Sequence, residues 1–250
     1  MNQSDGRRRF LKSVGVLGVA ALPAAATAAE THAQHGNAKA EKYMFLTPAE
    51  VAFVEAAVAR LIPVDELGPG AKEAGVAYFI DQQLFGGWGT MAKMYRQGPH
   101  PEGTPQQGYQ SPLTPQEVYR AAIREINGLT MKQHGKPFDK LAAQEQDEML
   151  RGLEEGKVAL EAVPARFFFN MLLDSTIEGF FSDPIYGGNR DKLGWKLVGF
   201  PGVAAVYTAH VDKHGVPYNA EPVSILDILE KRAEVDEHGH PKHVLLSRKD

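Results

Sequence analysis

Two pairs of side chains have a spacing that catalysis or metal binding would use. Asp174 and Glu178 are four residues apart, so on a helix they share one face and can act as an acid and a base. His210 and His214 have the same spacing, which suits two ligands of one metal ion. These residues support one hypothesis, in which the chain is an independent hydrolase or a metal-binding protein.

The histidine pair also has a simpler interpretation. Gly215 and Pro217 follow it directly, and no glutamate completes the H-E-x-x-H pattern of zinc enzymes. Histidines that face solvent are therefore the alternative expectation. In the charged C-terminal segment, weak adventitious metal binding is the expectation for three further histidines: His238, His240 and His243.

The acidic pair has a simpler interpretation too. Polar residues recur every four positions in an otherwise apolar segment, which predicts one narrow polar stripe along a helix. In that case Asp174 and Glu178 are solvated, or they pair with Arg166 or with an arginine of a partner. We favour pairing over catalysis. The members of the stripe are Arg166, Asn170, Asp174 and Glu178.

The composition excludes several kinds of chemistry. The chain has no cysteine, so it has no thiol nucleophile and forms no disulfide. It can bind neither a c-type haem nor an iron–sulfur cluster through cysteine. No G-x-G-x-x-G or G-x-x-x-x-G-K-[ST] string occurs, so the common nucleotide-binding loops are absent. We therefore expect no catalytic, cofactor-binding or metal site in this chain.

The first residues predict export of the folded chain. A basic segment is followed by an apolar segment at 13–22 and by a run of small residues at 24–29 that suits cleavage. The apolar segment has about ten residues, whereas a membrane span needs about 20. A receptor reads arginine pairs of this kind. We therefore expect a twin-arginine signal peptide over 1–28, the Tat translocase as a partner and the periplasm as destination. The signal residues are Arg7, Arg8, Phe10, Leu11 and Lys12.

Loss of residues 1–28 leaves an acidic chain. Four basic residues and one acidic residue leave with the signal, so 27 and 31 become 23 basic and 30 acidic residues, a net charge of −7. An acidic surface argues against nucleic acid and anionic lipid as partners. Because the export signal predicts the periplasm, the alternative hypothesis is an independent periplasmic hydrolase or metal-binding protein.

Helices dominate the remaining sequence. Thr47 and Thr114 each begin a T-P-x-E string, which predicts a capping box with proline in the first helical position. Apolar periodicity extends these starts and adds three more helices. We predict an all-α fold: a single irregular helical domain with long Gly/Pro-rich loops. The expected helices cover 48–62, 70–84, 115–132, 143–154 and 165–181. The expected divisions are 1–28 signal peptide, 29–43 flexible linker, 44–230 helical domain and 231–250 charged tail.

The most unusual segment follows the apolar helix. Glycine, proline and aromatic residues alternate from 182 to 202, and such turns can present large, rigid aromatic side chains to a partner. The alternative is a tight loop that packs on its own core. The candidate interface residues are Asp183, Pro184, Tyr186, Gly187, Gly188, Asn189, Trp195 and Phe200. The proline-rich loop at 98–115 is a second candidate.

This segment carries a resemblance to a known family. The string GFFSDPIYGGN at 179–189, with Gly194-Trp195 and GFPG at 199–202, resembles the gluconate 2-dehydrogenase subunit 3 family when combined with the export signal. The likeness covers roughly residues 44–225. It implies a non-catalytic small subunit that supplies the export signal and contributes no catalytic residues. It also implies an FAD-containing large subunit and a cytochrome subunit with haem c as partners, and association with the inner membrane through that complex.

Overall fold

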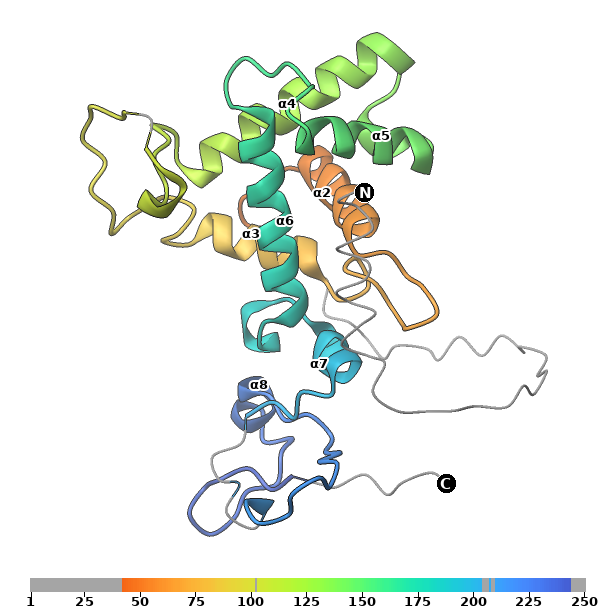
Figure 1. Cartoon of the computed structure of the whole chain (residues 1–250), viewed down its shortest axis with the longest axis vertical. Coiled ribbons are helices and arrows are strands. Elements are labelled where there is room, and N and C mark those ends of the chain that lie inside the picture. The colour runs from red at the N-terminus through yellow and green to blue at the C-terminus, as the bar shows by residue number, and fades with distance from the viewer. Residues whose placement is uncertain (1–41, 102, 204–206, 208–209, 244–250) are drawn as a thin grey trace, which may run out of the picture.

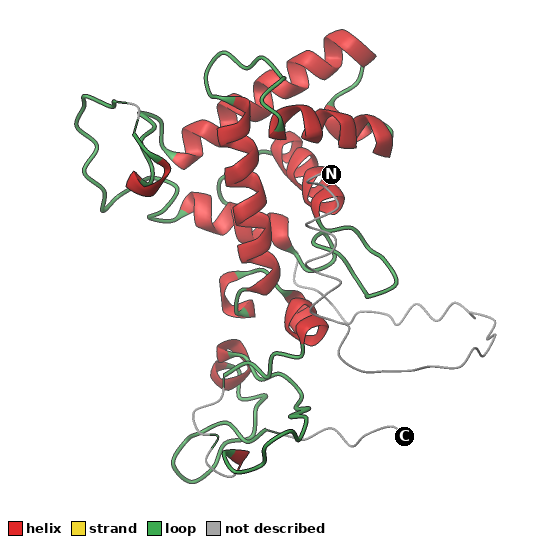
Figure 2. Cartoon of the chain, in the orientation of Figure 1, coloured by secondary structure: helices red, strands yellow, loops and turns green. Residues whose placement is uncertain are grey.

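The computed structural model of the chain describes residues 42–101, 103–203, 207 and 210–243. These residues form seven α-helices and no strand, which confirms the all-α prediction (Figure 2). No helix among them is long and apolar enough to cross a membrane. The α-helices are α2 (Pro48–Leu61), α3 (Val76–Phe85), α4 (Pro115–His134), α5 (Ala143–Glu154), α6 (Ala165–Phe181), α7 (Leu193–Val198) and α8 (Ile225–Leu229).

Two helices begin at the predicted capping boxes. The Glu50 side chain accepts from the Thr47 backbone N–H at 2.8 Å, and the Thr47 hydroxyl accepts from the Glu50 N–H. Thr114 and Glu117 repeat this arrangement at α4. The start of α3 was predicted six residues too early. Gly75 has a φ of +73°, a left-handed conformation that favours glycine, so the helix begins only at Val76.

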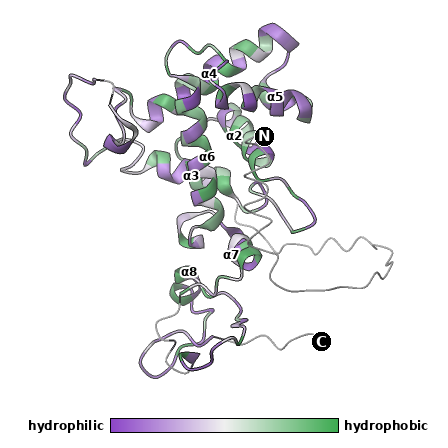
Figure 3. Ribbon diagram, in the orientation of Figure 1, coloured by the Kyte–Doolittle hydropathy of each residue, from purple (hydrophilic) through white to green (hydrophobic). Residues whose placement is uncertain are grey.

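Helix α6 is the centre of the fold. It crosses α3 and α4 and also packs against α2 and α5 (Figure 1). Its buried side supplies rings to the core: Phe168 lies 5.6 Å from the Tyr119 ring, edge to face. The predicted stripe of Arg166, Asn170, Asp174 and Glu178 is exposed. In Figure 3, hydrophilic colour predominates on the outer ends of α4 and α5.

A buried carboxylate on α3 holds the backbone that precedes α2. Asp81 on α3 is fully buried and accepts the backbone N–H groups of Met44, Phe45 and Leu46 at 2.7, 2.9 and 2.8 Å. Three such hydrogen bonds satisfy a charge that would be very costly to bury alone. The sequence placed Asp81 on a helix face but did not indicate this role.

Two irregular regions extend from the helical core. The proline-rich loop between α3 and α4 projects to the left in Figure 1, and Tyr109 within it lies 5.4 Å from Phe167 of α6. At the other end, the chain beyond α7 passes through one bridge between Gly202 and Val223 to the short α8 (Figure 1). The segment predicted as a partner interface lies between α6 and this region.

Candidate partner interface

The candidate interface segment, residues 183–202, is tied down at its start by Asp183. One Asp183 carboxylate oxygen accepts the Ile185 N–H at 3.0 Å, which caps the short 3-10 helix Pro184–Tyr186. The other oxygen accepts the Ile225 N–H at 2.7 Å, at the start of α8. Asp183 therefore shapes the start of the segment and joins it to α8, and Pro184 occupies the first position of the 3-10 helix.

The turn that follows packs closely on α6. Asn189 is fully buried; its amide N–H donates to the Ser182 carbonyl and its carbonyl accepts the Gly194 N–H, both at 2.8 Å. A Cβ on Gly188 would lie 2.2 Å from the Gly179 carbonyl oxygen, so only glycine fits there. Gly187 is left-handed with φ +94°. These residues fold the segment back onto the helix.

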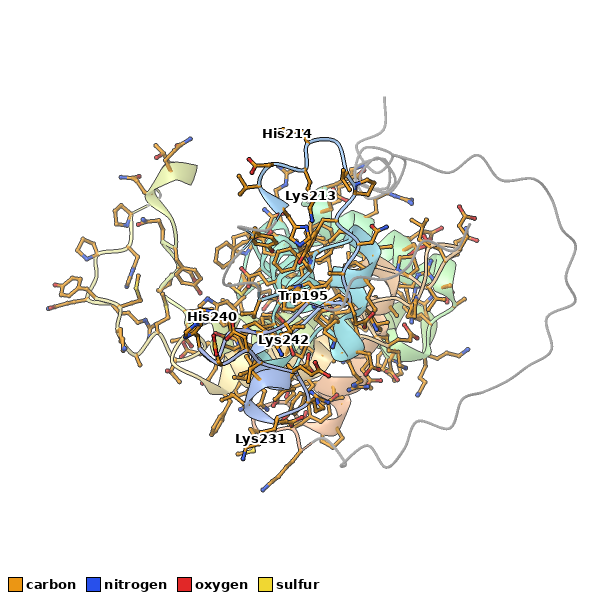
Figure 4. The ribbon with its side chains drawn as sticks, turned by 90° about the horizontal axis from the view of Figure 1, so that it is seen from below. Trp195, Lys213, His214, Lys231, His240 and Lys242 are labelled. Atoms are coloured by element: carbon orange, nitrogen blue, oxygen red, sulfur yellow. The ribbon has the colours of Figure 1, made fainter. Side chains whose placement is uncertain are left out.

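Trp195 is buried, although the sequence predicts that its side chain projects toward a partner. It is only 6% exposed, and its indole N–H donates to the Phe181 carbonyl at 2.7 Å. Its ring lies edge to face with Phe200, with centroids 5.1 Å apart. In the view from below, Trp195 lies near the centre of the projection, beneath α6 rather than at the rim (Figure 4). The expectation was wrong because the chain reversal at Asn189 turns α7 back onto the end of α6.

The remaining aromatic residues of the segment are accessible. Tyr186 is 54% exposed and Phe200 46%, and Ile185 beside Tyr186 is also exposed. On α7, Leu193 and Leu197 line an apolar groove of about 480 Å³ together with the loop that follows α2. The segment thus divides into buried residues that hold its shape and exposed apolar residues that a partner can contact.

A polar cavity of about 440 Å³ lies on the other side of the segment, next to α8. Lys192 and Arg232 both pair with Asp227, at 2.9 and 3.0 Å. Burial by itself would raise the pKa of Asp227, but hydrogen bonds from Lys192 and Ser224 and the Lys192 charge lower it to about 2. Asp227 therefore fastens α8 to the interface segment. The S-x-x-D spacing of Ser224 and Asp227 was the signal in the sequence that could have revealed this cap.

The two histidines proposed as a metal-binding pair, His210 and His214, have different surroundings. His210 packs its ring against Tyr218 at 4.9 Å, and His214 is exposed. His214 and His240 lie well apart in Figure 4. Among the residues that the structure describes, no group of three or more His, Cys, Asp or Glu side chains could hold a metal ion.

The acidic pair lies on the exposed face of α6. Neither Asp174 nor Glu178 lines the polar cavity or the apolar groove. One interpretation of the sequence pairs them with Arg166. The Arg166 guanidinium instead donates to the Glu154 carbonyl at 3.0 Å. The signal residues Arg7, Arg8, Phe10, Leu11 and Lys12 lie outside the described residues.

The described part of the chain is thus a helical protein in which Tyr186 and Phe200 are exposed on the segment that follows its central helix. The family model for gluconate 2-dehydrogenase subunit 3 matches residues 48–202, which are 155 of the 250 residues. The chain therefore belongs to the gluconate 2-dehydrogenase subunit 3 family, as its resemblance indicated. No curated protein and no solved structure matches the chain.

Proposed function

We propose that this chain is the non-catalytic small subunit of a periplasmic FAD-dependent gluconate or sugar dehydrogenase complex. It carries the Tat signal, and it escorts and stabilises the flavoprotein subunit. The observation that carries this proposal is membership of the gluconate 2-dehydrogenase subunit 3 family over residues 48–202. In the complex, FAD belongs to the large subunit and haem c to a cytochrome subunit, and the complex associates with the inner membrane.

The sequence supports the division of labour. The export signal around Arg7 and Arg8 is of the kind that delivers folded proteins, and folded export allows a flavin to be bound in the cytoplasm. A chain without cysteine or a nucleotide-binding loop is suited to supply the signal while its partner supplies the cofactor.

The interface segment supplies a contact surface of the required kind. Tyr and other aromatic residues are enriched among the side chains that dominate binding energy at protein interfaces. Tyr186 and Phe200 are exposed on a segment whose shape is already fixed by Asn189 and Trp195. A fixed segment loses little conformational entropy when it docks. We therefore assign these two exposed rings to the contact with the flavoprotein.

Deletion of the gene tests the proposal. We expect the flavin-dependent dehydrogenase activity to disappear from the periplasmic face of the inner membrane, and the flavoprotein subunit to accumulate in the cytoplasm or be degraded. Expression of the full-length chain from a plasmid should restore both. Full activity at the membrane in the deletion strain, with the flavoprotein correctly exported, would contradict the escort role.

A further inference from the structure

Exposed aromatic and apolar side chains lie close together in the sequence at the end of α3 and in the turn that follows it. Tyr95 keeps 84% of its surface exposed, the largest fraction among the large hydrophobic side chains that the structure describes. Single exposed apolar residues are ordinary, whereas a group of them marks contact with a protein or a membrane. We call residues 85–96 the aromatic turn. Its exposed members are Phe85, Trp88, Met94 and Tyr95.

Backbone contacts give the aromatic turn a fixed shape. A Cβ on Gly89 would lie 1.8 Å from the Leu84 carbonyl oxygen, so the chain folds tightly onto the end of α3. The Gly89 carbonyl accepts the Gln116 N–H at 3.2 Å, and the Gln116 side chain donates to the Leu84 carbonyl at 2.8 Å. The exposed rings are therefore carried by a turn that is fastened to both α3 and α4. Such a turn loses little conformational entropy when it binds another surface.

The charge of the aromatic turn differs from that of the whole chain. The chain has a net charge of −4 at pH 7, yet no aspartate or glutamate occurs from 82 to 101. The turn contains two cations, Lys93 and Arg96, and Lys93 is exposed. Glu117 at the start of α4 lies 3.8 Å from Arg96, and its carboxylate also accepts the Thr114 N–H at 2.7 Å. The aromatic turn is thus a locally basic surface on an acidic protein.

We propose that the aromatic turn binds the surface of an anionic lipid bilayer, with its rings among the headgroups. Trp and Tyr rings favour this boundary because each has an apolar body and a polar tip. Phe85 and Met94 bury apolar surface beside them, while Lys93 and Arg96 attract the anionic headgroups. Each such cation strengthens binding about fivefold. This inference goes beyond the proposed function, because the chain itself, and not only its complex, contacts the membrane.

Two features favour a lipid surface over the flavoprotein subunit. Lysine is depleted at protein interfaces, whereas basic residues beside aromatic rings are typical of segments that lie on membranes. The aromatic turn also lies at the C-terminal end of α3, whereas the interface segment packs near the other end, where Gly187 lies against the Tyr78 ring. In Figure 1 the chain between α3 and α4 projects from the side of the core, away from the foot of α6. The two surfaces are therefore separate.

Vesicle binding by the purified mature chain tests the inference. Residues 1–28 are left out because they are themselves basic and apolar, and the described residues begin only at 42. The chain is mixed with vesicles of phosphatidylglycerol and phosphatidylcholine in equal parts, or of phosphatidylcholine alone, and the bound fraction is measured by flotation. We expect binding to the anionic vesicles. Binding to the neutral vesicles should be at least about tenfold weaker, and high salt should weaken binding to the anionic ones.

Matched substitutions locate the contact. Trp88→Ala with Tyr95→Ala removes two exposed rings and should weaken binding to the anionic vesicles at least about tenfold. Lys93→Gln should weaken it about fivefold. Controls that remove similar groups from exposed positions elsewhere should bind as the wild type does. These controls are Tyr186→Ala with Phe200→Ala for the rings and Lys136→Gln for the charge.

The possible outcomes are distinct. Absence of wild-type binding to the anionic vesicles would overturn this inference, and so would equal binding by the ring variant and its control. Loss of affinity for the flavoprotein in the ring variant, with unchanged vesicle binding, would assign the turn to the partner instead. The vesicle assay uses this chain alone, so its failure leaves the proposed function standing. Thermal midpoints establish that each variant folds, and Tyr95→Ala alone serves where the double variant does not.

Discussion

Replacement of Trp195 by alanine should destabilise the chain strongly. The side chain is 6% exposed, donates to the Phe181 carbonyl and packs on Phe200. Truncation of a buried tryptophan typically costs about 3–5 kcal/mol, because it removes buried surface and leaves a cavity. For a chain of this size, about 1 kcal/mol shifts the midpoint by about 2–4 °C. We therefore expect the thermal midpoint of the mature chain to fall by about 6–20 °C.

Two further substitutions separate folding from docking. Trp88 is 44% exposed, so Trp88→Ala is a matched control and should cost under about 1 kcal/mol. Tyr186 is 54% exposed, so Tyr186→Ala should leave the midpoint nearly unchanged while affinity for the flavoprotein falls about thirtyfold, the equivalent of about 2 kcal/mol. Midpoints come from scanning calorimetry. A shift under about 2 °C for Trp195→Ala would refute the assignment of Trp195 to the core.

Three other predictions follow from the sequence and the site. Arg7→Lys with Arg8→Lys keeps the charge but not the guanidinium geometry, so cell fractionation should find the chain retained in the cytoplasm; normal delivery to the periplasm would contradict a twin-arginine signal. The pKa of Asp227 in the folded chain is lowered to about 2, so this carboxylate stabilises the fold by about 2 kcal/mol above pH ~4, and the stabilisation is lost as the pH falls toward 2. Asp227→Asn should therefore lower the free energy of unfolding more at pH 6 than at pH 3. An equal difference from the wild type at both pH values would refute this prediction. The purified mature chain should be colourless and without dehydrogenase activity with an artificial acceptor; a flavin spectrum that survives gel filtration would oppose a cofactor-free role.

The features that could be predicted from sequence depend on neighbouring residues. The capping boxes at Thr47 and Thr114 join residues three positions apart, so their strings define them completely. The apolar periodicity of 165–181 matches α6 at both ends. The class of fold follows from such local signals, because most of the described chain is built from these helices and their connections.

The features that could not be predicted depend on contacts far apart in the chain. Just before α3, the Ala74 carbonyl accepts the backbone N–H of Arg190, a residue far along the chain, at 2.9 Å. Asp81 binds backbone groups 35–37 positions away. Trp195 and Tyr186 share one glycine-rich segment, and only the fold separates the buried ring from the exposed one. Periodicity cannot make that distinction in a segment without regular structure.

Native mass spectrometry of the complex captured through this chain tests the central claim most directly. A tag at the C-terminus of the full-length chain is used to isolate it from the inner-membrane fraction under mild conditions. The proposed function predicts an assembly in which the mature chain accompanies a larger subunit that retains FAD and shows dehydrogenase activity. Recovery of the mature chain alone, while all flavin-dependent dehydrogenase activity stays in the unbound fraction, would contradict it.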